Sequence, residues 1–253
     1  MQLATFARHG QTGARIAEQL REVVTEHDQR APRSQQTALG PSEIGEPCPA
    51  ALARKLMGEQ RVNARSDPWP AIVGTATHAW LAEAFHAANQ RLGRIRYLVE
   101  TRVQIRAELA GSCDCYDADH GGVAIDHKVV GETAMRSYKR DGPSAQYRAQ
   151  IHLYGMGLAN LGLPVSTVAI AFYPRGGMLS GLHVWTEPYD PAVAQAALDR
   201  HDQILEAACA LGLDHTPGNY AHLPIVTGHR CTFCPYFSPG VEIGRACPGH
   251  MPQ

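Results

Sequence analysis

Two periods in the pattern of hydrophobic and polar residues divide most of this chain into helices and strands. A period near 3.6 residues predicts helices at residues 14–27, 50–57, 75–91, 142–161 and 190–211. A period of two predicts strands at residues 97–109, 123–130, 165–173 and 179–186, with one more strand through Cys113 and Cys115. This order of helix, three strands, helix, two strands and helix is typical of a mixed sheet with helices packed on it. We therefore expect an α/β fold.

Turn and cap residues give the expected domain boundaries. Residues 28–41 are polar and contain proline and glycine, so we interpret them as part of an N-terminal helix and linker (residues 1–41), followed by the main domain (residues 42–253). Thr75 or Thr77 is the expected N-cap of its helix. The tail from residue 216 onward is expected to be rich in loops.

The most informative stretch is a predicted hairpin with a tight connection at residues 119–122. Side chains of a strand alternate between its two faces, so Asp126 and Lys128 share one face. The hairpin brings Asp114 back almost opposite Asp126. Two carboxylates and a lysine thus converge within an apolar strand pair, which is costly unless a metal ion neutralises the acids.

Composition limits the classes of function without naming one. The chain has 253 residues, a formal net charge of −1, 44% hydrophobic and 19% charged residues, as is ordinary for a globular protein. This charge argues against a protein that coats nucleic acid by bulk charge, but it leaves room for a local basic groove. No apolar run approaches the roughly 20 residues of a membrane span, and the N-terminus lacks the apolar core of a secretory signal. We therefore expect a cytoplasmic protein.

Lysine is scarce in this chain. Only Lys55, Lys128 and Lys139 occur, while arginine supplies nearly all the remaining positive charge. This scarcity favours a specific role for Lys128, because arginine is bulkier and is effectively never deprotonated.

Seven cysteines in a cytosolic chain are better interpreted as thiols or metal ligands than as disulfides. Three of them are expected to be packing residues: Cys113, Cys115 and Cys209. Cys231 and Cys234 form a C-x-x-C pair, whose two thiolates can bind one metal. Such a metal needs two further ligands. Cys247 lies downstream of this pair, and Cys48 lies far upstream.

Four short elements carry a resemblance to a known family. In chain order they are a helix-start histidine, a Gly-x-x-Asp, an Asp-x-Lys and a Gln-x-x-x-Tyr helix, found at Gly74–His78, Gly111–Asp114, Asp126–Lys128 and Gln150–Tyr154. With these elements, the chain resembles the PD-(D/E)xK nuclease superfamily in its RecB-like branch. It is most similar there to the iron–sulfur exonucleases associated with CRISPR systems and with phages. The resemblance covers roughly residues 42–247.

The resemblance implies a fold and an activity. The fold is a restriction-endonuclease-like mixed central sheet flanked by helices, with N- and C-terminal segments joined at a metal cluster. The activity is that of a metal-dependent deoxyribonuclease, an exonuclease that hydrolyses phosphodiester bonds, with single-stranded DNA as the expected substrate. Partner proteins of phage replication, recombination or CRISPR systems are implied in the same way, as is the host cytoplasm for a phage-encoded protein.

The resemblance also assigns roles to residues around the hairpin. Mg²⁺ or Mn²⁺ would be held by the side chains of His78, Asp114 and Asp126 and by the backbone carbonyl of His127. Lys128 would orient the attacking water or stabilise the transition state. Two side chains of the following helix would position the lysine and the DNA strand: Gln150 and Tyr154. Two further acids were not expected to be ligands: Glu83 and Glu100.

Each of these assignments has a structural alternative. His78 is equally typical of a histidine in ordinary hydrogen bonds at a helix start. The Asp114, Asp126 and Lys128 set has an alternative as a structural ion pair under a loop. Gln150 and Tyr154 have an alternative as a polar helix face. Two other acids near the hairpin are interpreted as turn residues: Asp117 and Asp119.

The cysteines fit a pattern of the similar exonucleases, in which one N-terminal and three C-terminal cysteines hold a 4Fe–4S cluster. This set would be Cys48, Cys231, Cys234 and Cys247, and the cluster would act as a staple for the fold. The gap from Cys234 to Cys247 is longer than is usual in the family. Zinc therefore remains the alternative, with His229 or His250 competing as a ligand.

A basic run with interleaved tyrosines follows the hairpin. Arg136, Lys139, Arg140 and Arg148 are the candidate DNA-binding residues, and Arg175 is a further candidate for the same groove. Tyr138 and Tyr147 lie among them as candidates for base stacking, and the alternative is a solvated helix face. For the whole chain, two other functions stay open: a catalytically silent, metal-stapled nucleic-acid-binding module, and an endonuclease or RNase with a structural zinc.

Overall fold

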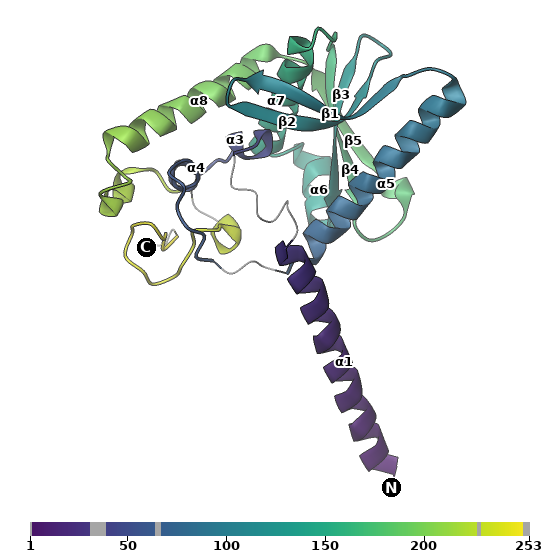
Figure 1. Cartoon of the computed structure of the whole chain (residues 1–253), viewed down its shortest axis with the longest axis vertical. Coiled ribbons are helices and arrows are strands. Elements are labelled where there is room, and N and C mark those ends of the chain that lie inside the picture. The colour runs from purple at the N-terminus through teal and green to yellow at the C-terminus, as the bar shows by residue number, and fades with distance from the viewer. Residues whose placement is uncertain (1, 31–38, 64–66, 227–228, 250–253) are drawn as a thin grey trace. The chain divides into compact units, whose positions relative to one another are not determined.

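The computed structural model describes residues 2–30, 39–63, 67–226 and 229–249 of the chain (Figure 1). The chain divides into two units. One contains α1 (Gln2–Arg30) and residues 67–72, and the other contains residues 39–63 and the described chain from residue 73 onward. The predicted helix at residues 14–27 lies within α1, and the candidate site residues lie in the second unit.

A five-stranded mixed sheet forms the centre of the second unit, in the order β1-β2-β3-β4-β5. Its strands are β1 (Tyr97–Arg106), β2 (Leu109–Asp117), β3 (Val123–Val130), β4 (Thr167–Pro174) and β5 (His183–Pro188). β3 and β4 are parallel, and the other neighbouring pairs are antiparallel. The predicted α/β class with a mixed central sheet flanked by helices is therefore confirmed.

Six α-helices belong wholly or mostly to the described part of the second unit. They are α3 (Pro41–Ile44), α4 (Pro49–Leu56), α5 (Trp69–Leu92), α6 (Glu132–Asp141), α7 (Ala145–Asn160) and α8 (Pro191–Ala210). Short 3₁₀ helices lie at η1 (Leu179–Gly181), η2 (Pro217–His222) and η3 (His229–Phe233). None of the helices in the described ranges combines the length and apolarity that a bilayer span requires.

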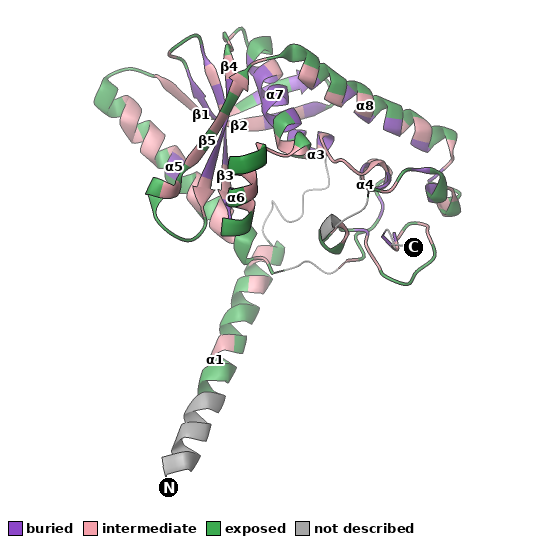
Figure 2. Ribbon diagram, turned by 180° about the vertical axis from the view of Figure 1, so that it is seen from behind, coloured by how far each residue is buried: buried purple, intermediate pink, exposed green. Residues whose placement is uncertain are grey.

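The main core lies between the sheet and α7. Buried residues of β2, β3 and β4, among them Cys113 and Phe172, form one core cluster with residues of this helix such as Leu158. Figure 2 shows the buried residues gathered on the strands and on α7. α6 and α7 together form the connection from β3 to the parallel strand β4, as a parallel pair requires. The central helix thus lies directly against the strands that carry the candidate site.

The connection from β2 to β3 is as tight as the sequence predicts. His120, Gly121 and Gly122 all have positive φ, and the Gly122 N–H donates to the Asp119 carbonyl at 3.1 Å. A Cβ on Gly122 would lie 1.9 Å from the Pro164 carbonyl oxygen, so this position requires glycine. Cys115 pairs with Ile125 as a result, and the register is that of the predicted hairpin.

Several local predictions were wrong. α5 begins at Trp69, so neither threonine is its N-cap; Thr77 lies inside the helix, where its hydroxyl donates to the Val73 carbonyl at 2.8 Å. α6 was not predicted as a helix. Residues 179–182 form a 3₁₀ turn before β5 rather than part of the strand. Cys209 is exposed on α8 rather than packed in the core.

Candidate functional site

Three acidic residues lie in one row across β1, β2 and β3. The β1–β2 register pairs Val99 with Cys115 on one side of Glu100, which puts Glu100 opposite Asp114. The β2–β3 register, continued by one residue, puts Asp114 opposite Asp126. Like charges directly opposite each other destabilise a sheet. A row of three carboxylates therefore favours a bound cation.

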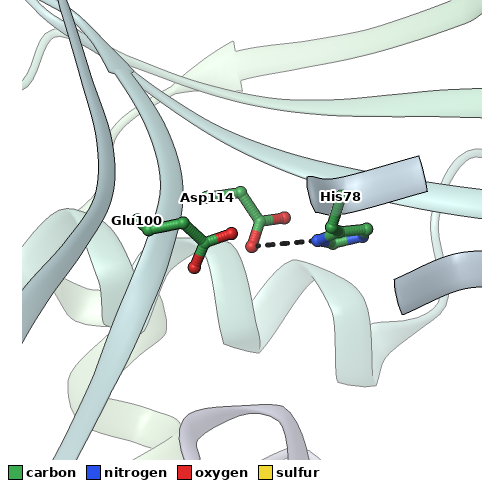
Figure 3. A group of neighbouring side chains, drawn as sticks. All are labelled: His78, Glu100 and Asp114. Atoms are coloured by element: carbon green, nitrogen blue, oxygen red, sulfur yellow. Dashed lines mark ion pairs between the residues drawn. The ribbon is translucent and has the colours of Figure 1, made fainter. Parts of the chain in front are cut away.

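His78 of α5 joins this row (Figure 3). Its Nδ1 lies 3.5 Å from Asp114 Oδ1. One ligand atom from each of His78, Glu100 and Asp114 lies within 4.8 Å of the others, a spacing that suits one metal ion. The sequence interpretation had set Glu100 aside. The position of Glu100 opposite Asp114 follows from the position of the β1–β2 turn, because that turn fixes which residues of the two strands pair.

The backbone at Glu100 is unusual. Its φ is +47°, in the left-handed region that a residue with a side chain rarely adopts. Such strain persists where the surrounding structure imposes it, and it often occurs at functional sites. At Glu100 it lies within a strand, opposite the carboxylate that contacts His78.

Asp126 is the buried member of the row, and its partners come from β3 and from α7. Lys128 Nζ lies 2.7 Å from Asp126 Oδ2, and Gln150 Nε2 donates to Asp126 Oδ1 at 3.0 Å. Gln150 also lies 3.4 Å from the Tyr154 hydroxyl, and Lys128 lies over the ring of Tyr147 at 4.9 Å. This ion pair requires the side chains of Asp126 and Lys128 to lie on the same face of β3, as the sequence predicts. The structure thus brings Asp126, Lys128, Gln150 and Tyr154 together.

The electrostatics differ between the two aspartates. Burial raises the pKa of Asp126 to about 6, although Lys128 opposes this effect. Burial also acts to raise the pKa of Asp114, but hydrogen bonds from His78 and from the His127 N–H hold it below its ordinary value. The hydrogen bond with Asp114 in turn raises the pKa of His78 despite its partial burial. The ionised form of Asp114 is therefore stabilised by its hydrogen bonds, whereas the ionised form of Asp126 is disfavoured by burial.

The His127 imidazole lies on the opposite face of β3 from Asp126. It stacks on Phe85 of α5, with ring centroids 5.6 Å apart and an interplanar angle of 6°. Both ring nitrogens are buried and have no hydrogen-bond partner among the described residues. Burial lowers the pKa of His127 to about 4, so the ring is neutral. Only the backbone of His127 is placed to take part at the acidic row.

Replacing His127 by leucine should stabilise the protein. Leucine has a similar volume and no polar atoms, so the change removes two buried nitrogens that lack partners. We expect the free energy of unfolding to rise by about 1–2 kcal/mol in urea denaturation. Binding of Mn²⁺ should not change, because the backbone carbonyl remains. A loss of Mn²⁺ affinity in this variant would show that the imidazole itself is a ligand.

One upstream and three C-terminal cysteines line one cavity of about 460 Å³: Cys48, Cys231, Cys234 and Cys247. Cys48 is the N-cap residue of α4, and Cys247 is buried. Burial raises the pKa of Cys234, with smaller contributions from Cys48 and Cys247. Of the alternative ligands, His250 lies outside the described residues, and the side chain of His229 is likewise not described.

The sulfur spacing bears on which metal fits this cavity. In a tetrahedral zinc site the sulfurs lie about 3.8 Å apart, since each Zn–S bond is about 2.3 Å. Within the described ranges, no three cysteine sulfurs lie within 4.8 Å of one another. The described cysteine side chains therefore do not have the spacing of a formed zinc site.

The predicted basic run is not a row of free cations. Arg136 pairs with Glu132, Arg140 with Asp141, and Arg148 with Glu187. Lys139 and Arg175, by contrast, have no acidic partner within the described residues. The surface therefore carries less net positive charge than the sequence indicates.

The two tyrosines of the basic run face the core. Tyr138 stacks on Phe172 at 4.5 Å, and its ring lies 5.9 Å from that of Tyr147. Both are partly buried against the main core. The prediction that they stack on bases is wrong, because their ring faces are already in contact with the protein.

No protein-family model and no curated protein sequence matches this chain. Similar solved structures include two of the alkaline exonuclease LHK-Exo from Laribacter hongkongensis, one in complex with dAMP, and one of a phage-related exonuclease from Haemophilus somnus 129PT. The two LHK-Exo structures match with TM-scores of 0.47, at 15% and 14% identity, over 70% and 69% of this chain and 91% and 89% of theirs. The third has a TM-score of 0.42 and 14% identity, over 69% of this chain and 94% of its own.

Proposed function

We propose that this protein is a metal-dependent deoxyribonuclease. The observation that carries the proposal is the row of Glu100, Asp114 and Asp126, with His78 beside Asp114 and Lys128 beside Asp126. Hard oxygen ligands of this kind suit Mg²⁺ or Mn²⁺, and a histidine nitrogen shifts the preference toward Mn²⁺. Hydrolysis of phosphodiester bonds is the reaction for which such a site is suited.

The ligand set proposed from the structure is larger than the set from the sequence. His78, Glu100 and Asp114 are the members that the structure groups together. Asp126 and the backbone carbonyl of His127 are kept in the set on the resemblance of the sequence elements. A divalent ion held there supplies charge neutralisation at the phosphate and a lowered pKa of bound water. Glu100, which is exposed, lies on the open side of the row and Asp126 on the buried side.

The remaining residues orient groups around the row. Lys128 is held between Asp126 and the Tyr147 ring, where its ammonium group would stabilise negative charge on the scissile phosphate or orient the attacking water. Gln150 fixes the Asp126 carboxylate through a direct hydrogen bond, and Tyr154 contacts Gln150. These two side chains are therefore positioning residues rather than ligands.

Single-stranded DNA, attacked from an end, is the substrate we propose, in keeping with the resemblance of the four sequence elements. Lys139 and Arg175 are the cations we propose for contact with the phosphates. Arg175 is tied to the site strand, because its N–H donates to the Val130 carbonyl at 2.8 Å. Arg136, Arg140 and Arg148 would have to exchange acidic partners for phosphates in order to contribute.

A structural 4Fe–4S cluster held by Cys48, Cys231, Cys234 and Cys247 is the second part of the proposal. The observation that supports it is the cavity that the four cysteines share. The cluster would join segments about 180 residues apart, which closes a very long loop. A single zinc ion is the alternative that metal analysis would distinguish.

An assay on defined DNA substrates tests the proposed activity. We expect end-labelled linear single strands to be degraded with Mn²⁺ or Mg²⁺, and circular single strands to be spared. The chelator EDTA should abolish the reaction. Cleavage of circles would indicate an endonuclease, and cleavage of RNA alone would indicate an RNase. Binding of DNA without any metal-dependent cleavage would identify a silent binding module.

A further inference from the structure

Arg54 on α4 is fully buried, and its hydrogen bonds to described residues all go to backbone carbonyls. Nη1 donates to the Ala50 carbonyl at 2.8 Å, within its own helix. Nε donates to Arg245 at 2.9 Å, and Nη2 donates to Gly244 at 2.6 Å and to Ala246 at 3.3 Å. One guanidinium group thereby binds three successive carbonyls of a segment outside any helix or strand.

The same segment is held from a second direction. The Arg54 guanidinium lies 4.1 Å from the centre of the Tyr220 ring, and the Tyr220 hydroxyl donates to Glu59 at 3.1 Å. Glu59 also accepts two hydrogen bonds from Arg245, at 3.0 and 2.9 Å. Residues 244–246 are therefore fixed through their backbone by Arg54 and through a side chain by Glu59. Cys247 follows directly.

A second side chain holds the C-x-x-C pair. The amide Nδ2 of Asn63 donates to the carbonyls of Thr232 and Cys234, at 3.0 and 2.9 Å. The backbone N–H groups of Val62 and Asn63 both donate to the Pro235 carbonyl at 2.9 Å. This pair of cysteines is thus bound to the segment that follows α4.

We infer that Arg54 and Asn63 are positioning residues for the four-cysteine site. Arg54 lies six residues after Cys48 on one short helix and binds the three residues that precede Cys247. Asn63 binds the backbone at the C-x-x-C pair. The segments that carry the cysteines are therefore held together by contacts that involve no metal. This inference rests on the proposed cofactor for its function, but the spacing itself can be tested without it.

The chemistry explains why an arginine occupies this buried position. A guanidinium group presents five N–H donors in a rigid planar fork, so it can bind several carbonyls that lie in different directions. A lysine carries its donors on one nitrogen and cannot reach the same set. An apolar residue would leave three successive carbonyls without their partner, at a free-energy cost for each one that stays buried.

Residue-resolved alkylation of the chelator-stripped protein tests the positioning. In Arg54→Ala we expect Cys247 to react with N-ethylmaleimide at least about tenfold faster than in the wild type, as read by peptide mass spectrometry. Cys113, which is fully buried in the sheet, serves as the internal control and should not change. Arg54→Lys should behave like Arg54→Ala, because the fork is lost. Arg106→Ala, which removes a partly buried arginine paired with Asp202, should behave like the wild type.

The reconstituted protein gives a second readout. We expect the absorbance near 400 nm to be lost to a chelator about tenfold faster in Arg54→Ala and in Asn63→Asp, which lacks the amide donors. Unchanged Cys247 alkylation, or equal increases at Cys247 and Cys113, would overturn the role of Arg54. Wild-type behaviour of Arg54→Lys would overturn the argument from geometry. Wild-type protein that binds no iron would refute the proposed cofactor, while the alkylation comparison would still decide the positioning.

Discussion

Asp126→Asn is expected to lower the rate of DNA hydrolysis on the order of 10³-fold. The side chain keeps its size and its contact with Gln150, but it loses the charge that binds the divalent ion and the ammonium group of Lys128. Because Asp126 is buried, no neighbouring acid can take its place from solvent. Single-turnover cleavage of an end-labelled strand in Mn²⁺ measures the effect.

The matched control is Asp119→Asn. Asp119 lies in the β2–β3 connection and pairs with Arg94 at an exposed position. The same chemical change there should leave the cleavage rate within about twofold, since exposed ion pairs contribute little. If Asp126→Asn kept a rate within tenfold of the wild type, the proposed metal mechanism would fail.

Cys48→Ala is expected to remove the chromophore near 400 nm and to lower the melting temperature by roughly 10 °C. Cys48 is the upstream ligand of the proposed cluster, and without it the segments on either side of a loop of about 180 residues are no longer joined through the cluster. Iron analysis together with thermal unfolding followed by circular dichroism measures both effects.

Cys209→Ser provides the control for this cysteine series. Cys209 is exposed on α8 and does not line the cavity, so both the chromophore and the melting temperature should be retained. A colourless wild-type protein with one equivalent of zinc would identify the site as a zinc staple. Unchanged stability in Cys48→Ala would mean that this cysteine does not hold the two segments together.

Local chemistry explains why much of the central sheet could be predicted. The β2–β3 turn contains Gly121 and Gly122, whose positive φ fixes the register and hence the place of Asp114 opposite Asp126. The alternation along β3 places Asp126 and Lys128 on one face. Both inferences need only the residues of one hairpin, which is why they hold in the structure.

The predictions that failed depend on distant contacts or on exact turn positions. Glu100 was missed because its neighbour depends on where the β1–β2 turn lies, and the predicted strand ran through that turn. The pairing of Arg148 with Glu187 joins residues that no local pattern connects. Tyr138 lies among charged residues in the sequence, but in α6 its ring faces the core and stacks on Phe172. Arg54 gave no signal at all, because its partners lie about 190 residues away.

The parallel pairing of β3 with β4 has a consequence for synthesis of the protein. All four sequence elements are complete once Tyr154 has been translated, yet β3 gains its second neighbour only from residues 167–174. A nascent chain that ends between them carries the complete set of site residues on an unfinished sheet edge. We therefore expect a ribosome-bound intermediate of this length to be inert toward DNA, so that the potential nuclease stays silent until β4 has been made.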